Sequence, residues 1–590
     1  MITAITSPRK RPDFLVYDLE WIPTFRSDGA MNADPMGLRM AGVFDGERYR
    51  WYKTIDTFID HELTDKNRGK WFYAHAGGLA DLQYLIVRLK DRGFWIQGST
   101  SGSSVIICHV SRPMQRRQRD GSIKWVAGKN RWHFVDSYWL IRDSLRNIGK
   151  WADVGGKGNE DESVDYYADA PIIELRDYNE RDCRILYRGI QLFEETLYSL
   201  GGQLCMTQAS CAMDLFRRRF LKSDIETSMS VNEVVRKAYF ASRVEVFATE
   251  CGEAYYYDIN SSFPYAMTFP VPGELKHAYK GKPRGDPDDL WMADVQIEVP
   301  ESYLPTTPIR EKGRLFFPTG KWRGWYTNID IQMLLESGGK IDRMYESMVF
   351  NPRTDLRDYC NTLYDLRKQS DGVIKVVCKY LMNSLYGKFA ESDLKSEIII
   401  NPPTVKEGWT EVSPGVFINE KIVPIPHMHV PIAAHVTAVA RRTLNTYMGM
   451  SSKLHYCDTD GFSTCQRYRD GSELGEIKLE KFINRGRFVQ AKVYHLDGTD
   501  SAGKEIQVVK AKGFSKVDLP TFERLLNFEE IEFVRMARIR ENARRGIFTP
   551  RENVVHKGIR KNAISKRCFD RFGQSRAWEI DELRDALCGD

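Results

Sequence analysis

The chain has 590 residues, which is too many for one hydrophobic core and predicts about two to four domains. Apolar residues make up 42% of the sequence and charged residues 28%, a balance that excludes long disordered regions. The formal net charge of +6 does not by itself indicate a nucleic-acid partner. No apolar run reaches the ~18 residues of a membrane span, and the amino terminus lacks the apolar segment of a secretory signal.

Short β-like runs alternate with helical periodicity in residues 1–200. The runs 14–17, 71–74 and 105–108 predict strands, whereas 82–89 and 182–197 predict helices. This alternation is typical of one α/β domain. A break follows near 201–202, and a helical stretch then continues to about residue 222.

A second mixed region begins at Tyr255. Pro and Gly cluster between 270 and 324, which favours irregular or β structure, and the Pro-rich segment 398–430 is typical of a hairpin-like insertion. Helical periodicity covers 359–389 and 437–450, and the runs 454–457 and 462–464 predict two strands around a tight turn. The last 70 residues are mixed and basic.

The basic residues are unevenly distributed. Residues 112–131 hold seven Lys or Arg against one Asp, and residues 535–567 hold eleven against two Glu. Such stretches suit either tracks for phosphates or charge-rich solvated faces, and the composition favours neither. The eleven cysteines form no Cys-x-x-Cys pair, so they predict neither a zinc site nor a disulfide scaffold and are typical of a reducing compartment.

Two acids follow the strand candidate 454–457. Asp458 and Asp460 are one residue apart, and Gly461 completes a turn. Two carboxylates at the end of a buried strand are costly unless a cation or hydrogen-bond donors compensate them, so both can face a metal. Taken alone, however, Asp-x-Asp-Gly is ordinary turn chemistry.

Asp258 ends another strand candidate and precedes a tight turn and a short helix. The backbone N–H groups of such a turn can cradle a phosphate, with Asp258 holding magnesium beside it. In isolation the pattern also fits a simple helix cap.

The predicted helix 375–387 carries a polar stripe. At about 100° per residue, one arc of the helix holds Lys375, Lys379, Asn383 and Tyr386, and the opposite side holds Ile374, Val377, Leu381 and Leu385. One face can therefore bind an incoming triphosphate while the other packs. A cationic stripe alone is usually solvated surface, but an Asn and a Tyr continue this one.

These three segments, in this order, resemble the polymerase motifs of the family B DNA polymerases, which read Asp-x-x-Ser-Leu-Tyr-Pro, Lys-x-x-x-Asn-Ser-x-Tyr-Gly and Asp-Thr-Asp-Ser. The run Asn383-Ser384-Leu385-Tyr386-Gly387 is the most specific match. The resemblance implies a DNA-directed DNA polymerase with a right-hand palm, fingers and thumb. It also implies that Lys492 and Tyr494, in a Lys-x-Tyr motif, steady the primer strand, and that Lys375 contacts DNA.

The amino-terminal part resembles the 3′–5′ exonuclease of the same family, a ribonuclease H-like domain with four metal-binding acids. Asp18-Leu19-Glu20 fits the first motif, 75–81 with Asp81 the second, and 178–182 the third. The implied set of catalytic residues is Asp18, Glu20, Asp81, Tyr178, Asp182 and an auxiliary Lys157. Ser144 and Leu145 fit the pair that contacts the single strand.

The resemblance is strongest to the protein-primed subgroup of small linear-genome phages and linear plasmids, and it implies an α/β and α+β multidomain protein. Residues 1–200 are then the exonuclease and 201–590 the polymerase. Within the polymerase we expect a palm at 230–300 and 431–515, a first insertion at 301–355, fingers at 356–395, a second insertion at 396–430, and a thumb and carboxy-terminal region at 516–590. In the family the first insertion contacts the priming protein, and the second promotes strand displacement.

The implied mechanism uses two Mg²⁺ ions per active site, with Mn²⁺ as a substitute, held by Asp258 and Asp460 with Asp458 in support. The expected nucleotide-binding residues are Ser261, Ser262, Phe263 as a steric gate against ribose, Lys379, Asn383 and Tyr386. The expected partners are a DNA primer-template, deoxynucleoside triphosphates and a terminal priming protein. We expect a monomer with no membrane association in the cytoplasm of a bacterial host.

The sequence departs from the family pattern at several positions. Gly461 replaces the Ser that follows Asp-Thr-Asp, Ser262-Phe263 stands where Leu-Tyr is usual, and Ala76 and Ala80 replace the Asn and Phe that hold the single strand. Residues 239–242 match the Tyr-x-Gly-Gly linker poorly. All seven acids are present, which predicts chemistry at both sites and puts strand handling by the exonuclease in doubt.

Three other functions fit parts of the pattern. The chain can be a family B polymerase that starts without a primer or from an ordinary primer, because these enzymes differ mainly in the insertions. It can also be a non-catalytic DNA-binding relic, although binding alone does not require seven acids. A pure nuclease would not need the Lys-Asn-Tyr helix.

Overall fold

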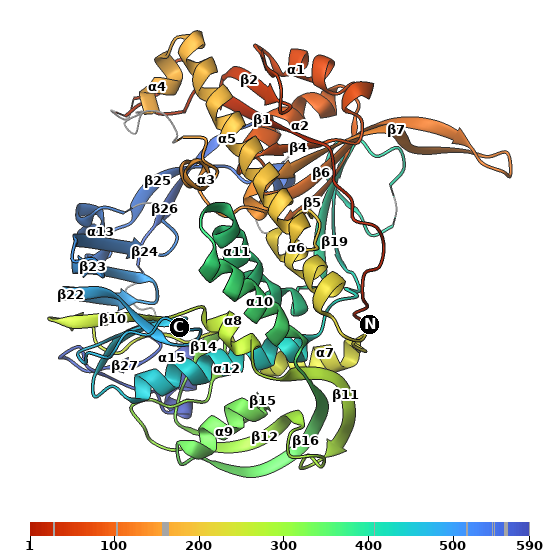
Figure 1. Cartoon of the computed structure of the whole chain (residues 1–590). Helices are drawn as coiled ribbons and strands as arrows, with labels where there is room; N and C mark the ends of the chain where they lie inside the picture. Colours follow the sequence, from red (N-terminus) through yellow and green to blue (C-terminus); the bar gives the residue numbers. More distant parts are fainter. Residues whose placement is uncertain are drawn as a thin grey trace.

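The computed structural model describes residues 1–27, 30–101, 104–155, 164–405, 407–514, 517–545, 547, 549–559 and 564–588. A ten-stranded sheet dominates the amino-terminal part, in the order β18-β19-β17-β5-β6-β7-β4-β1-β2-β3 (Figure 1). Its strands are β1 (Phe14–Trp21), β2 (Leu38–Phe44), β3 (Tyr49–Tyr52), β4 (Trp71–Ala74), β5 (Trp95–Ser101), β6 (Ser104–Arg117), β7 (Ile123–Asp136), β17 (Leu394–Ile400), β18 (Thr410–Ser413) and β19 (Val416–Ile422). β1, β4 and β7 run parallel, and the three strands predicted from the sequence lie in β1, β4 and β6.

Helices cover both faces of this sheet. α1 (Ile55–Glu62) and α2 (Asp81–Asp91) pack on one face, and α3 (Leu145–Trp151) and the long α5 (Ile172–Ser199) lie on the other. The alternation of β1 decides which residue faces which layer. Leu15, Tyr17 and Leu19 pack with α1 and α2, whereas Val16 packs with α5. Asp18 and Glu20 have the same parity as Val16, so the fold turns both acids towards α5.

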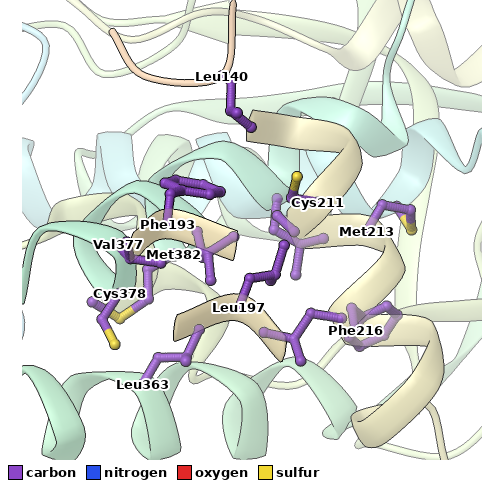
Figure 2. Close-up of a cluster of buried hydrophobic side chains, with 14 of the residues drawn as sticks. Leu140, Phe193, Leu197, Cys211, Met213, Phe216, Leu363, Val377, Cys378 and Met382 are labelled. Carbon is purple, nitrogen blue, oxygen red and sulfur yellow. The ribbon is translucent and has the colours of Figure 1, made fainter. Parts of the chain in front are cut away.

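The core on the α5 side continues into the helices of the carboxy-terminal part. It joins α5 to α6 (Gln208–Leu215), α10 (Asp355–Gln369) and α11 (Gly372–Phe389). Figure 2 shows Phe193 and Leu197 of α5 beside Leu363, Val377 and Met382. The single helix predicted over 359–389 is therefore wrong, because Ser370 and Asp371 separate α10 from α11 and Gly372 has a φ of +57°.

A second sheet has the order β24-β23-β22-β10-β21-β20-β8, with β9 paired to β22. Its strands are β8 (Val244–Val246), β9 (Glu250–Cys251), β10 (Ala254–Ile259), β20 (Leu454–Asp458), β21 (Gly461–Thr464), β22 (Ile477–Gln490), β23 (Val493–Asp500) and β24 (Glu505–Ala511). Beside this sheet lie α8 (Ser262–Met267) and α12 (Val430–Gly449). α12 begins seven residues before the helix predicted at 437.

A third, four-stranded sheet has the order β11-β16-β12-β15. Its elements are β11 (Val271–Lys280), β12 (Leu290–Val299), β15 (Gly320–Thr327) and β16 (Lys340–Arg353), with α9 (Asn328–Glu336) packed on it and the hairpin β13 (Ile309–Glu311) and β14 (Arg314–Phe316) beside it. The Pro- and Gly-rich region is thus largely β structure, as predicted. The predicted second insertion does form a hairpin, but β17 pairs with β5 and extends the amino-terminal sheet.

The carboxy-terminal residues form two separate structures. α13 (Leu519–Leu526), β25 (Ile531–Met536), α14 (Ile539–Arg544) and β26 (Glu552–Lys557) come first, and α14 contributes Ile539 and Ala543 to the core of the amino-terminal sheet. β27 (Cys568–Phe569), β28 (Ser575–Arg576) and α15 (Ile580–Cys588) follow, and α15 packs against the four-stranded sheet. No helix in the described part of the chain has the length and apolar character needed to cross a bilayer.

Candidate active sites

Three strands bring the acids of the second sheet together. In the antiparallel register Asp258 of β10 and Asp458 of β20 both lie opposite Gly461 of β21. Thr459 takes a positive φ of 68° in the turn, and the Ile259 N–H donates to the Asp460 carbonyl oxygen at 2.9 Å. This hydrogen bond ties the β20–β21 turn to the end of β10, so the sequence-distant acids share one edge of the sheet.

Burial and mutual repulsion disturb two of these acids. Burial, followed by the negative charge of Asp460, raises the pKa of Asp258 to about 7. Burial and the charge of Asp458 raise the pKa of Asp460 to about 6. Neighbouring carboxylates that resist ionisation are stabilised by a cation placed between them. The oxygen-only donor set is the one that Mg²⁺ prefers.

Asp458 instead has a protein cation beside it. Lys492 Nζ lies 3.2 Å from Asp458 Oδ1, and the Tyr456 hydroxyl donates to Asp458 Oδ2 at 3.4 Å. Within the described ranges, no three His, Cys, Asp or Glu side chains already converge as a metal cluster. Binding of metal therefore requires Asp458 to exchange its lysine for the ion, or to support the site from outside it.

The acids open into a cleft of about 720 Å³ between β10, α8, α10 and α11. Its lining residues are Asp258–Phe263, Tyr364, Arg367, Lys368, Lys375, Lys379, Asn383, Tyr386, Asp460 and Ser472. All four residues of the predicted helical arc thus face the cleft, and Val377, Leu381 and Leu385 are buried behind them. Ile374 is only partly buried.

One aromatic pair shapes the cleft. The rings of Phe263 and Tyr386 are stacked, with centroids 4.4 Å apart and planes at 11°. Ser261 has a positive φ of 50°, and its hydroxyl accepts a hydrogen bond from Arg367 Nη1 at 3.0 Å. Ser262 also borders the cleft, but only 2% of it is exposed, so its side chain offers little surface to a nucleotide.

The sequence-based reading missed two cations of this cleft. Arg367 and Lys368 line it from α10, and Lys368 Nζ lies 2.7 Å from Glu473 Oε1. Their only sequence signal is their position at the end of a helix that precedes the Lys379 helix by a short turn. The helix break at Ser370–Asp371, once recognised, would have placed both residues at the mouth of a helical hairpin.

The acids of the amino-terminal sheet form a second buried group. Leu19 N–H donates to Asp81 Oδ1 at 3.0 Å, which joins β1 to the first residue of α2. Asn179 Nδ2 of α5 donates to Asp18 Oδ2 at 2.9 Å and to Glu20 Oε1 at 3.1 Å. Asn179 lies inside the third exonuclease motif but was not predicted as a site residue.

Charge accumulates at this second site. Burial, together with the charges of Asp182 and Asp81, raises the pKa of Glu20 to about 8. Burial, with the charge of Asp136, raises the pKa of Asp81 to about 7. The structure therefore brings these predicted acids into one electrostatic group, and it adds Asp136, which the motifs did not indicate.

The remaining predicted exonuclease residues are placed as follows. The Tyr178 hydroxyl lies 3.1 Å from the Tyr167 hydroxyl, and Ser144 caps α3 by accepting from Asn147 N–H at 3.3 Å. Leu145, the first residue of α3, packs against the core shared with α5. Lys157 lies outside the described residues.

A model of the family described as DNA polymerase type B, organellar and viral, matches residues 159–410. This segment of the chain therefore resembles that family. It is 24% identical to a probable DNA polymerase of Podospora anserina over 653 aligned positions, which cover 88% of this chain and 54% of that protein. It is 25% identical to the DNA polymerase of Bacillus phage phi29 over 374 positions, which cover 57% of this chain and 62% of that protein. The chain thus spans less than two thirds of the length of either relative.

The fold of a type B polymerase extends over nearly the whole chain. A solved structure of phi29 DNA polymerase, complexed with primer-template DNA and incoming nucleotide substrates, superposes with a TM-score of 0.70 at 18% identity, covering 93% of this chain and 99% of that one. The predicted fold class, a ribonuclease H-like domain followed by a right-hand polymerase domain, is confirmed. The domain boundaries stay predictions.

The packing of the second sheet explains one departure from the polymerase motifs. A Cβ atom added to Gly461 would lie 2.8 Å from the Tyr256 hydroxyl, so a Ser here would collide with that ring. Tyr494 of the Lys-x-Tyr motif is only 3% exposed and packs 5.3 Å from the Tyr456 ring. Its contact with DNA stays a prediction, and little of its surface is open to such a contact.

Proposed function

We propose that this chain is a template-directed DNA polymerase that adds deoxynucleotides to a primer 3′-hydroxyl. The observation that carries the proposal is the shared cleft, in which Asp258 and Asp460 face the cationic helix α11 across the Phe263–Tyr386 stack. Acids at one wall suit a metal-assisted attack, and cations at the other suit a triphosphate.

The side chains of the cleft have separable roles. Lys379 and Lys368 attract the triphosphate, and Arg367 holds the Ser261 turn against which it lies. Tyr386 fixes the Phe263 ring by stacking, so that the ring forms a rigid floor under the sugar and excludes a ribose 2′-hydroxyl. Exposed Asn383 borders the position of the nascent base pair.

Asp258 and Asp460 would hold the divalent cation, with Asp458 in support, since burial and then the charge of a neighbouring acid raise the pKa of each. When bound, Mg²⁺ would lower the pKa of the primer 3′-hydroxyl and neutralise charge on the departing pyrophosphate. Lys492, which pairs with Asp458, holds that carboxylate in place.

The amino-terminal site supports a second activity, 3′–5′ exonuclease. The observation that favours it is the set of buried Glu20, Asp81 and Asp182 beside the partly buried Asp18. Burial, and then the charges of Asp182 and Asp81, raises the pKa of Glu20, so a cation would stabilise the ionised site. Asn179 bridges the first two acids and holds their orientation. Tyr178 and Lys157 are proposed to position water and the scissile phosphate.

A more specific proposal concerns initiation, for which a protein would serve as the primer. The phage and fungal polymerases that the chain resembles support it. The residues of the two predicted insertions lie in β13 to β16 with α9 and in the β17–β19 hairpin, which suits this proposal. The partners in this proposal are primer-template DNA, deoxynucleoside triphosphates and a terminal protein, and the proposed location is the cytoplasm of a host cell.

The decisive experiment is primer extension with Mg²⁺ by the full chain and its Asp258→Asn variant. We expect extension to fall about a thousandfold or more, corresponding to ~4 kcal/mol of lost transition-state stabilisation. Glu336→Gln, which alters an exposed acid of α9, is the matched control and should extend normally. Template binding without extension by the unaltered chain would show a DNA-binding relic. Incorporation on a primer-free template would show a different mode of initiation.

A further inference from the structure

The strands β6 and β7 continue past the sheet as a two-stranded arm. β5 pairs with β6 only as far as Ser111, and β4 pairs with β7 only from His133. Between these points, in residues 112–131, the described ladder joins β6 only to β7, and Figure 1 shows the ribbon projecting from the body. At its base the Arg112 guanidinium stacks 4.8 Å from the Phe94 ring centre, which anchors the arm to the domain.

The arm is basic in sequence, and the described arginines on its two faces lack acidic partners. Residues 112–131 contain seven Lys or Arg and one Asp, and the Asp120 carboxylate accepts from Ser122. Arg116 and Arg117 are exposed and form no ion pair within the described residues. Arg88, an exposed arginine of α2, is by contrast paired with Asp56. A run of unpaired cations repels itself and suits a polyanion.

The two faces of the arm differ. Gln115 pairs with Trp125 and Arg117 pairs with Ile123, and because paired and alternate residues share a face, these four lie on one side. Trp125 is 41% exposed and Ile123 is 65% exposed. The other side carries Met114 and Arg116 and no aromatic ring among its described side chains.

We propose that the Trp125 face of the arm binds single-stranded DNA. A base can stack on the indole ring only where its own face is uncovered, which a duplex does not allow. Arg117 lies on the same face, two residues along β6 from the Gln115 that pairs with Trp125, and can bind the backbone phosphate. The proposal goes beyond the proposed polymerase function and rests on it only in that a polymerase works beside single-stranded DNA. The arm is a separate site, outside the cleft that Asp258 and Asp460 share.

The test measures binding of a labelled oligothymidylate of about 20 nucleotides to the full chain, with the polymerase cleft saturated by an unlabelled blunt-ended duplex. We expect Trp125→Ala to weaken this binding about five- to a hundredfold. Arg117→Gln should reduce the slope of log affinity against log salt by about 0.7, the value for one lost phosphate contact on a single strand. All variants should unfold at the temperature of the unaltered chain, because the replaced side chains are exposed.

Two control variants sharpen the test. Met114→Ala with Arg116→Gln alters the opposite face, and Arg48→Gln with Lys53→Gln removes two exposed cations beside β3, at the far edge of the sheet. Both should keep the affinity for the oligonucleotide. Unchanged affinity in Trp125→Ala would overturn the proposal, as would equal losses from the two faces, or binding of a protein by the arm without any effect on DNA. Extension of a primed template by the Trp125→Ala variant reports separately on the proposed polymerase function.

Discussion

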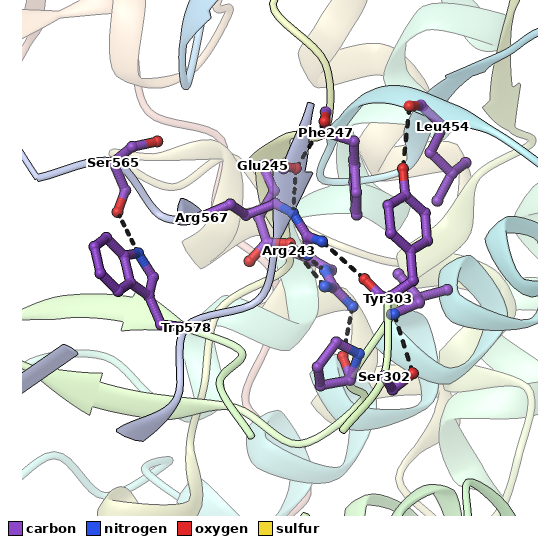
Figure 3. A network of polar contacts seen from close by, with 12 residues as sticks. Arg243, Glu245, Phe247, Ser302, Tyr303, Leu454, Ser565, Arg567 and Trp578 are labelled. Atoms are coloured by element: carbon purple, nitrogen blue, oxygen red, sulfur yellow. Dashed lines mark hydrogen bonds and ion pairs between the residues drawn. The ribbon is translucent and has the colours of Figure 1, made fainter. Parts of the chain in front are cut away.

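A buried ionic network beneath the polymerase turn gives the sharpest prediction about stability. Glu245 of β8 has no exposed side-chain surface, and its Oε2 atom lies 2.7 Å from Arg243 Nη2 and 3.5 Å from Arg567 Nη1 (Figure 3). The Arg243 carbonyl oxygen accepts the Thr459 N–H at 2.9 Å, inside the Asp458–Asp460 turn. The network therefore joins the carboxy-terminal segment to the turn that carries Asp458 and Asp460.

Glu245→Gln removes the one carboxylate that two buried guanidinium groups share. Breaking a buried pair in this way costs about 3–5 kcal/mol, and we expect the lower end, about 3 kcal/mol, because a Gln oxygen still accepts hydrogen bonds. At about 2–4 °C per kcal/mol for a cooperative unit of palm size, the melting temperature should fall by about 6–12 °C. Extension should fall with it at temperatures near the new midpoint.

The assay compares thermal unfolding of the unaltered chain, Glu245→Gln and the double variant that also carries Arg567→Met. The double variant should lose less than the sum of the single losses, because removing Arg567 also removes one of the stranded charges. Glu336→Gln, an exposed partner of Arg442, is the control and should cost less than about 1 kcal/mol. A Glu245→Gln protein that melts within about 1 °C of the unaltered chain would refute the reasoning.

Three further outcomes are expected. Phe263→Ala should raise ribonucleotide incorporation about 10- to 200-fold in a sugar-competition assay, and unchanged discrimination would remove Phe263 as the gate. Asp18→Ala with Glu20→Ala should abolish degradation of a labelled primer and spare extension, whereas joint loss would indicate misfolding. Burial lowers the pKa of His435 to about 4, so the stability that its neutral form provides is complete above the unfolded pKa of about 6.5 and declines as the pH falls towards 4. Between about pH 7.5 and pH 5 the free energy of unfolding should therefore fall by about 2 kcal/mol more in the unaltered chain than in His435→Leu. Equal losses in both proteins, measured by thermal unfolding, would contradict this assignment.

Local patterns predicted the parts of the sites that lie within one element. The parity of β1 places Asp18 and Glu20 on one face, and the 3.6-residue period of α11 places Lys379 and Asn383 along the cleft. Pairings between distant segments left no such signal. Nothing in β17 marks β5 as its neighbour, because strand pairing depends on backbone groups and on shape rather than on a local sequence code.

The carboxy-terminal basic run shows where charge counting fails. Its eleven cations favoured neither a phosphate track nor a solvated face, yet Arg567 is only 1% exposed and serves the Glu245 network. Burial lowers the pKa of both Lys566 and Arg567, which means that the fold stabilises these charges less well than water does. The sequence shows the sign of a charge but not whether its side chain is buried. Burial decides whether an arginine binds a phosphate of a ligand or a carboxylate within the protein.

The Gly461 position shows how a departure from a motif can be compensated within the fold. Tyr256 and Asp258 alternate on β10 and so share a face, and the Tyr256 hydroxyl occupies the space beside Gly461 where a Ser side chain would lie. Burial raises the pKa of Tyr256, and the charges of Asp458 and Asp258 add to the rise, so the phenol keeps its proton. The hydroxyl that the motif loses at 461 is thus replaced by one from the neighbouring strand. The two acids keep their positions opposite residue 461 because the strand register, and not the side chain at 461, sets them.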